Sequence, residues 1–536
     1  MPLDLSVPSQ LTFAMLPDLL LMAGAMVLLL YAAWRPPSAA HQRAVGIGSI
    51  VLTLGTGAVV AYFAWRGYAS GNGVVAVDNF RWAADGIFLL GALLTTVMSI
   101  EYERREAINA PESHVLVLLS TSGMMLLAAA RDMMLMFLAI EVTSVAVYVL
   151  SGMNRRSARS AEGALKYFLL GAFSTAFLLY GIALVYGATG STNYAVIAQR
   201  LADPATLGSP LLKVGLALLV IGYGFKIAAV PFHMWAPDVY EGAPTPITAF
   251  MAASVKAGAF AGFLRLFVEA FSPASSQWHY AVWVLAAATM FVGNLIAFSQ
   301  RNLKRLLAYS SIAHAGYALI TVVVGVGTGE AHGVTGSSAF LFYMLAYTLS
   351  TMGAFAVVSA LGSPGERRLE VEEYSGLWTV RPGLTLAMTV FLLALLGFPV
   401  FGGIGFFAKW YLLLAALNGG TAPQTRLAVI LVFTSILSAG YYLYVVTVMF
   451  VRPRPDDARP LPAVGGLTNA VIAASVALIL ILGFAPTQVL RRAIASALGP
   501  AAPAAGAPAR GAAPVAGIAR PATLPARLTP AAAGGR

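Results

Sequence analysis

The chain alternates long apolar stretches with short polar connections. A helix of about 20 apolar residues spans the ~30 Å hydrocarbon core of a bilayer, and the sequence contains 14 such stretches. They cover residues 11–32, 45–66, 84–103, 112–130, 132–151, 161–187, 210–230, 245–271, 280–299, 303–325, 335–361, 383–418, 425–452 and 466–487. This pattern predicts an all-α polytopic membrane protein with about 14 transmembrane helices. The first stretch lacks a preceding basic region and a small-residue cleavage site, so we expect a retained helix and not a signal peptide.

Two of the predicted helices are interrupted. The interrupting residues are Pro231 in the seventh helix, with Pro237 beyond it, and Pro399, Gly402, Gly403 and Gly405 in the twelfth. Proline removes a backbone donor and clashes with the preceding turn. Backbone freed in this way is tolerated at membrane depth only inside protein or beside a wet cavity. A matched pair of broken helices points to inverted repeats with a transport site at the breaks; two simple kinks are the alternative.

The two breaks lie five helices apart and therefore suggest two five-helix inverted repeats. We predict helices 1–3 with an external hairpin at residues 1–111, a first repeat of helices 4–8 at 112–271, and a second repeat of helices 9–13 at 280–452. The last helix and its end occupy 453–498, and a tail of Ala, Pro, Gly and Arg at 499–536 is expected to be disordered. The hairpin is expected at residues 72–82, which alternate like a short strand.

Composition supports a membrane protein and narrows its chemistry. Hydrophobic residues make up 59% of the chain and charged residues 10%, with a mean hydropathy of +0.79, whereas soluble domains are about 25% charged. The sequence has no cysteine, which excludes disulfides, iron–sulfur clusters and thiolate sites. It also shows no nucleotide-binding glycine loop after a strand and no His pair spaced for a metal. We therefore expect no cofactor and no metal in this chain.

Basic residues predict the orientation. With the N-terminus outside, the cytoplasmic connections carry 16 Lys and Arg residues and the opposite connections carry six, as the positive-inside rule requires. An even number of helices then places both termini outside, and the arginines of the tail are the exception to the rule. The net charge of +11 arises at helix ends and in the tail, so it indicates no nucleic-acid partner.

The most informative residues are charges inside apolar stretches. The chain has six lysines against 27 arginines, and four of the lysines lie in long apolar segments. The five interior charges are Lys166, Lys226, Lys256, Lys409 and Glu141. A charge at the bilayer centre costs about 2.5–3.5 kcal/mol on insertion scales, so such residues are usually functional. Lys166 lies close to the start of its helix, where snorkelling to the surface is the alternative.

Proton transfer is the chemistry that suits these groups. Burial favours the neutral form of both lysine and glutamate, and a nearby opposite charge reverses the effect. A Lys–Glu pair whose separation changes can therefore release and recapture a proton, and a row of lysines with intervening water can act as a relay. Structural ion pairs are the alternative, although one glutamate leaves several lysines uncompensated.

Two histidines are further relay candidates because an unperturbed imidazole titrates near pH 6.5. His233 follows the proline of the broken seventh helix, and His314 lies within the tenth apolar stretch. The alternatives are a hydrogen-bonded core histidine or, with two such residues, haem ligation, which nothing else in the chain supports. The remaining histidines fall at predicted helix ends or loops and are expected to be solvated; they are His41, His114, His279 and His332.

Long segments of the chain resemble a known family. They are GFKIAAVPFHMWAPDVYEGAPTPITAFMAASVKAGAF, NLKRLLAYSSIAHAGY and AEGALKYFLLGAFSTAFLLYG. They closely resemble the antiporter-like membrane subunits of respiratory complex I. Within that group, DVYEGAPTPITAF followed by SVKAGAF is similar to subunit N of bacterial NADH–quinone oxidoreductase, the counterpart of mitochondrial NADH dehydrogenase subunit 2. The resemblance covers approximately residues 80–450.

The resemblance implies 14 helices, two inverted five-helix repeats and broken seventh and twelfth helices. It also implies roles for the interior charges. The pair Glu141 and Lys226 would gate proton uptake, Lys256 would pass the proton laterally, and Lys409 would release it outward. Lys166, His233 and His314 match further positions of the family. The chain would be a multi-pass subunit of a translocase in the bacterial inner membrane.

The implied protein acts only within an assembly. It would contact other antiporter-like and small membrane subunits, while flavin, iron–sulfur clusters and the quinone substrate belong to partner subunits, because this chain has no redox centre. Two alternatives stay open beside a proton pump driven by quinone reduction elsewhere. One is a subunit of a multi-subunit Na⁺/H⁺ antiporter of the same fold, and the other is a structural membrane scaffold.

Overall fold

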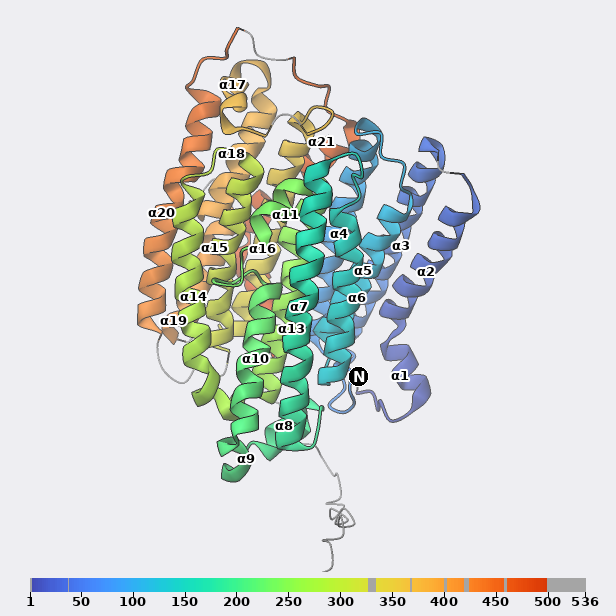
Figure 1. Cartoon of the computed structure of the whole chain (residues 1–536), viewed down its shortest axis with the longest axis vertical. Helices are drawn as coiled ribbons and strands as arrows, with labels where there is room; N and C mark the ends of the chain where they lie inside the picture. Colours follow the sequence, from blue (N-terminus) through green and yellow to red (C-terminus); the bar gives the residue numbers. More distant parts are fainter. Residues whose placement is uncertain are drawn as a thin grey trace, which may run out of the picture.

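The protein is a bundle of long helices that run roughly side by side (Figure 1). This computed structural model describes residues 2–36, 38–325, 334–366, 369–399, 403–418, 424–456 and 460–498. In these ranges the only β-structure consists of isolated bridges. Twelve of the described helices are long and apolar enough to cross a membrane. The two broken helices bring the bundle to the 14 crossings that the hydrophobic pattern predicts.

The first seven crossings are α2 (Leu16–Trp34), α3 (Ala39–Arg66), α4 (Asn79–Arg105), α5 (Glu112–Ala129), α6 (Met133–Ser151), α7 (Ala158–Thr189) and the broken pair α10 (Pro210–Lys226) and α11 (Ala236–Gly242). The eighth is built from α12 (Thr245–Phe250), η1 (Met251–Val255), α13 (Lys256–Arg265) and η2 (Leu266–Ala270). The others are α14 (Ser275–Ala297), α15 (Leu303–Val323), α16 (Gly336–Leu361), the broken pair α18 (Pro382–Leu396) and α19 (Ile404–Asn418), α20 (Thr425–Phe450) and α21 (Gly466–Phe484). Short helices complete the fold: α1 (Pro8–Ala14), α8 (Tyr194–Arg200), α9 (Pro204–Gly208), η3 (Ser272–Ala274), η4 (Val371–Tyr374), α17 (Leu377–Val380) and α22 (Pro486–Ala495).

Both predicted breaks are present, but they begin earlier than the prolines suggest. The helix α10 ends at Lys226 itself, because Ala228 adopts a left-handed backbone with φ of 57°. The helix α18 ends at Leu396, and the following Gly397 has φ of 77°, a conformation that glycine adopts without strain. Lys226 is therefore the last helical residue before the first break, although Pro231 lies further along the chain. Gly402 lies outside the described residues.

Residues 72–82 form no strand, so the strand-like alternation there is misleading. Isolated antiparallel bridges join Ser70 to Val77 and Val75 to Ala130, and α4 begins already at Asn79. Asp78 is the reason, because its side chain accepts a hydrogen bond of 2.9 Å from the backbone N–H of Arg81. An aspartate in this N-cap position satisfies a free donor of the first helical turn and fixes the start of the helix.

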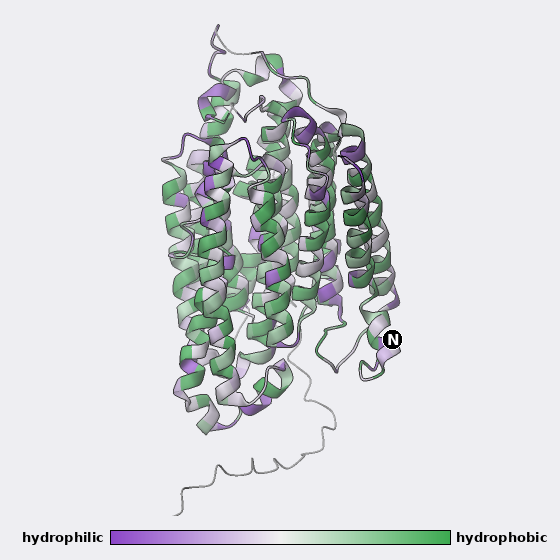
Figure 2. Cartoon of the chain, turned by 45° about the vertical axis from the view of Figure 1, so that its right-hand side comes forward, coloured by the Kyte–Doolittle hydropathy of each residue, from purple (hydrophilic) through white to green (hydrophobic). Residues whose placement is uncertain are grey.

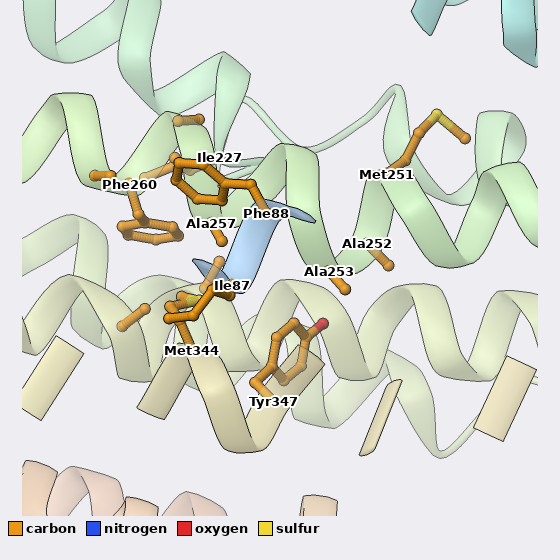
Figure 3. Packing of buried hydrophobic residues seen from close by; sticks show 14 of the residues in the cluster. Ile87, Phe88, Ile227, Met251, Ala252, Ala253, Ala257, Phe260, Met344 and Tyr347 are labelled. Carbon is orange, nitrogen blue, oxygen red and sulfur yellow. The ribbon is translucent and has the colours of Figure 1, made fainter. Parts of the chain in front are cut away.

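The centre of the bundle is formed by the eighth crossing, α15 and α16, which are almost wholly covered by other helices. In contrast, only 28–33% of the residues in the apolar segments of α2, α3, α7, α20 and α21 are buried, as expected of helices that face lipid. Hydrophobic residues dominate the length of the bundle, and polar residues gather mainly near its ends (Figure 2). The close view of the centre shows α4, η1, α13 and α16 packed through Phe88, Met251, Phe260, Met344 and Tyr347 (Figure 3).

The two described ends of the chain lie on the same side of the bundle. The side chain of Asn79, at the start of α4, donates a hydrogen bond of 3.2 Å to the carbonyl of Ala495 in α22, and the N-terminus lies at this same end (Figure 1). An even number of crossings is thus confirmed. The division into two five-helix repeats stays a prediction, and the tail at 499–536 lies outside the described residues.

Candidate functional site

The first group of site residues connects α6, α7 and α10. The ammonium of Lys226 donates to Ser144 Oγ at 2.9 Å and lies 3.3 Å from Tyr148 Oη and 3.5 Å from Thr175 Oγ1. The hydroxyl of Thr175 donates to Glu141 Oε1 at 2.9 Å. Glu141 and Lys226 are thus joined through one hydroxyl group and form no direct ion pair in the described structure. A small change in geometry can make or break this link.

The second group surrounds Lys256 at the centre of the bundle. Its ammonium donates to the carbonyl of Ser311 at 2.8 Å and also contacts the Ser311 hydroxyl, which accepts a 2.9 Å hydrogen bond from Tyr347 Oη. Lys256 is buried and is the first residue of α13, directly after the π-helical turn of η1. Such π-turns are often found at functional sites. All contacts of Lys256 named here are with neutral oxygens.

The third group joins α15, α16, α19 and α20. His314 Nδ1 lies 2.6 Å from Tyr343 Oη, and its Nε2 lies 3.3 Å from Tyr442 Oη. Lys409 Nζ donates to the carbonyl of Leu396 at 2.9 Å, which is the last residue of α18, so this lysine contacts the edge of the second break. His314 and Lys409 line one small cavity of about 10 Å³. That is close to the minimum for one water molecule.

The second and third groups adjoin each other, whereas the first is set apart. The ring of His314 lies 4.9 Å from that of Tyr347, the residue that bonds to Ser311 beside Lys256. Between Lys226 and Lys256 the described residues provide no continuous hydrogen-bonded chain. Aromatic rings lie beside Lys226 instead: Tyr148 meets Tyr167 edge to face at 4.7 Å, and Tyr167 stacks on Trp235 at 4.4 Å between centroids.

Lys166 and His233 occupy more peripheral positions. The side chain of Lys166 is 42% exposed and pairs with Glu162 at 2.7 Å and with Asp238 at 2.8 Å. This geometry matches the snorkelling alternative raised by its position near the helix start. His233 is half-buried in the connection between α10 and α11, and no hydrogen bond in the described structure joins it to Lys226.

Sequence reasoning missed several buried charges. Lys304 lies in the first turn of α15, yet its side chain is 0% exposed and pairs with Glu366 Oε2 at 2.8 Å. His114 was expected to be solvated but is buried 3.2 Å from Glu103, and His41 is also buried. Neighbouring helices cover these helix-end residues. Other buried charged residues that the sequence pattern did not single out are Asp18, Arg81, Asp85, Arg265 and Glu269.

One of these omissions had a signal in the sequence. Arg265 and Glu269 both lie within the eighth apolar stretch, four residues apart, and pair at 2.6 Å in the structure. Opposite charges at this spacing face each other on a helix. The pair formed by Arg81 and Asp18 is 63 residues apart in sequence, and no local pattern announces it.

Fold and site together define a polytopic membrane protein whose two broken helices each place a lysine at the break. Comparisons with known proteins agree. The family described as NADH:quinone oxidoreductase/Mrp antiporter, TM, matches residues 130–438. NADH-quinone oxidoreductase subunit N of Gemmatimonas aurantiaca is 51% identical over 487 residues, which cover 89% of this chain and 92% of that protein.

Solved structures show the same relationship. A chain of respiratory complex I from Thermus thermophilus superposes with a TM-score of 0.72 at 36% identity and covers 90% of this chain and 100% of that chain. A chain of the Mrp complex from Dietzia sp. superposes with a TM-score of 0.76 at 22% identity, covering 90% and 97%; that likeness concerns the fold alone. This chain belongs to the subunit N family of NADH-quinone oxidoreductase. It is a membrane subunit of the assembly, as the resemblance implied.

Proposed function

We propose that this chain moves protons across the membrane through its buried lysines, driven by quinone reduction elsewhere in the oxidoreductase. The observation that carries the proposal is the set of partners around Lys226, Lys256 and Lys409. Each ammonium is held by hydroxyl or carbonyl oxygens and none forms an ion pair in the described structure. Neutral acceptors at these sites do not lock the lysine in its charged form, as a contacting carboxylate does.

The proposed relay moves one proton at each step. Lys226 is protonated while Thr175 links it to Glu141, and it becomes a neutral amine when that link is broken and its proton leaves toward Lys256. Because no continuous hydrogen-bonded chain joins these two lysines, intervening water is needed there. The proton then passes from Lys256 by way of Ser311, Tyr347 and His314 to Lys409, which releases it at the second break.

The peripheral residues are assigned to the entry side. Lys166 is exposed at one end of α7 with Asp238 and Arg305 nearby, where Arg305 Nη1 lies 2.8 Å from Asp238 Oδ1. We propose that this rim collects protons and that His233, within the first break, stands between the rim and the interior. Flavin and iron–sulfur clusters are assigned to partner subunits.

The decisive experiment compares two lysines on one helix. Lys226→Met and Lys213→Met each remove a lysine from α10, but Lys213 is exposed. In the purified complex reconstituted into vesicles without Na⁺, Lys226→Met is expected to abolish most proton pumping while Lys213→Met pumps like the wild type. Normal pumping by a fully assembled Lys226→Met complex contradicts the relay. A requirement for Na⁺ favours the antiporter alternative, and co-purification with flavin and iron–sulfur subunits favours the oxidoreductase.

We also propose that both termini face outside, on the basis of the distribution of Lys and Arg. The absence of native cysteine allows a clean test with single cysteines. Ser38→Cys in the α2–α3 connection and Ala205→Cys in α9 are both exposed and lie at opposite ends of the bundle (Figure 1). An impermeant thiol reagent added to intact cells is expected to label Ala205→Cys and to spare Ser38→Cys. The reverse pattern inverts the topology.

A further inference from the structure

A second cluster of charges lies away from the lysines, around the start of α4. It holds four carboxylates and three guanidiniums: Asp18, Asp78, Asp85, Glu269, Arg81, Arg131 and Arg265. They come from α2, the N-cap and first turns of α4, the connection between α5 and α6, and the end of the eighth crossing. Four members lie outside residues 130–438, the part matched by the family: Asp18, Asp78, Arg81 and Asp85. We call this set the outer charge cluster.

Most members of the outer charge cluster are paired by short contacts. Arg265 donates to both oxygens of Asp78 at 2.8 Å and to Glu269 at 2.6 Å. Arg131 contacts Glu269 at 2.9 Å and Asp78 at 3.3 Å. Although burial opposes it, the charges of Arg265 and Arg131 hold the pKa of Asp78 at about 2. Asp78 is therefore ionised at neutral pH.

Arg81 is committed to other acceptors. It donates to Asp18 Oδ2 and to the backbone carbonyls of Ala76, at 3.0 Å, and Ala14, at 3.4 Å. This arrangement ties α2 and the end of α1 to α4. Each guanidinium of the cluster thus has a carboxylate in hydrogen-bonding contact, and those contacts involve Asp18, Asp78 and Glu269 only.

Asp85 is the carboxylate that is left over. Its side chain is 0% exposed, and neither of its oxygens has a hydrogen-bond partner in the described structure. The nearest cationic atom is Arg81 Nε at 3.6 Å, which is too long for a charge-assisted hydrogen bond of about 2.7–2.9 Å. With all seven groups ionised, four negative charges face three positive charges. The only ion pair of Asp85 in the described structure is this long contact with an arginine that already bonds to Asp18. A buried carboxylate that accepts no hydrogen bond is costly in its charged form and favours the protonated form.

We propose that Asp85 is a proton-binding site, occupied at neutral pH, that makes the outer charge cluster electrically neutral. The bound proton leaves Asp18 as the sole ionised counterpart of Arg81 and so preserves the attachment of α2 to α4. A metal ion is a poorer occupant, because no group of three or more His, Asp or Glu in the described residues is arranged to hold one. This proton is separate from the relay, since none of the cluster contacts above involves Lys226, Lys256 or Lys409.

Infrared difference spectroscopy of the purified complex tests this assignment. The spectrum of wild type minus Asp85→Asn is expected to contain the carbonyl stretch of a protonated carboxylic acid, which shifts in D₂O. The matched control is Asp78→Asn, which removes an ionised aspartate from the same cluster. Wild type minus Asp78→Asn is expected to show only loss of carboxylate bands.

Stability provides the second measurement. Asparagine closely resembles a protonated aspartate in shape and charge, so Asp85→Asn is expected to assemble and to melt like the wild type, whereas Asp78→Asn lowers the melting temperature. Loss of a carboxylate band in Asp85→Asn overturns the proposal. So does failure of Asp85→Asn to assemble, because a neutral substitution then removes a charge that the fold requires.

Discussion

Lysines occur in this protein in two kinds of surroundings. Lys256 at the centre of the bundle and the half-buried Lys409 beside the second break donate to serine and backbone oxygens. Neither has a carboxylate in contact in the described part of the chain. Lys304 and Lys166, nearer the ends of their helices, pair with Glu366 at 2.8 Å and with Asp238 at 2.8 Å. Burial does not distinguish the two kinds of lysine, because Lys304 is as buried as Lys256. What distinguishes them is whether a carboxylate contacts the ammonium group.

This difference determines which lysines are held in their charged form. An ion pair favours the charged form of both partners. If one partner of a buried pair is removed, the other is left as an uncompensated charge. A lysine among hydroxyls and carbonyls can instead exist as an ammonium or as a neutral amine with the same neighbours. The paired lysines therefore keep their charge, and the unpaired ones are those to which we assign the transfer of protons through the interior.

The largest effect is expected when a permanent charge replaces a lysine. Arginine stays protonated in proteins, so Lys256→Arg keeps the positive charge but cannot release the proton. Proton pumping in vesicles is expected to fall to the background leak, a loss of about 10²-fold or more in the transfer step. Lys304→Arg is the matched control, since an arginine can still pair with Glu366 and pumping should persist.

The comparison fails if the two arginine variants behave alike. Pumping by an assembled Lys256→Arg complex shows that Lys256 does not need to lose its proton. Loss of pumping in Lys304→Arg, with normal assembly, assigns a transfer role to the paired lysine as well. Immunodetection of the complex in native gels establishes assembly in both cases.

A second effect is expected on stability and not on pumping. Glu366→Gln leaves the buried ammonium of Lys304 without its counter-ion, and breaking a buried pair typically costs about 3–5 kcal/mol. Glu366 Oε1 also accepts hydrogen bonds from Tyr102 and Thr245, both at 2.6 Å, so α4, α12 and α15 lose a common contact. A lower melting temperature of the complex is the expected result.

The control for this variant is Glu372→Gln. Glu372 is more than half exposed and pairs with Arg452 at the surface, where ion pairs contribute little. Its melting temperature should stay close to that of the wild type. Equal destabilisation in the two variants contradicts the structural role assigned to the buried pair.

The same carboxylate predicts a dependence on pH. Burial opposes ionisation of Glu366, but the charge of Lys304 and the hydrogen bonds from Lys304, Thr245 and Tyr102 together lower its pKa below the ordinary value of 4.5. Its stabilising contribution is therefore fully present above pH 4.5 and is lost as the pH falls through the lower, folded-state pKa. The difference in melting temperature between wild type and Glu366→Gln should be constant near neutral pH and shrink below pH 4.5. A difference that widens on acidification has the wrong sign.

The contrast between these lysines also explains what the sequence revealed. Lys226 and Lys256 interrupt apolar stretches, and Pro231 marks a break. All three could therefore be identified from the neighbouring sequence alone. Whether a charge is paired depends on residues far along the chain. Lys304 meets Glu366 across 62 residues, and its position near a helix start gave no hint of burial. No periodicity in the sequence indicates the π-turn before Lys256.

The smallest effect is expected from the hydroxyl that joins Glu141 to Lys226. Thr175→Val removes this link and keeps the shape of the side chain, while Ser144 and Tyr148 still contact Lys226. A hydrogen bond contributes about 0.5–1.5 kcal/mol net, so we expect a roughly two- to tenfold slower pumping rate. Thr447→Val on α20 is the control, because this exposed hydroxyl bonds only to the carbonyl of Leu443 within its own helix. If both variants pump alike, the coupling between Glu141 and Lys226 does not pass through Thr175. Glu141 then acts on Lys226 through its negative charge alone. In that case Lys226, like the paired lysines, responds directly to the charge of a nearby carboxylate.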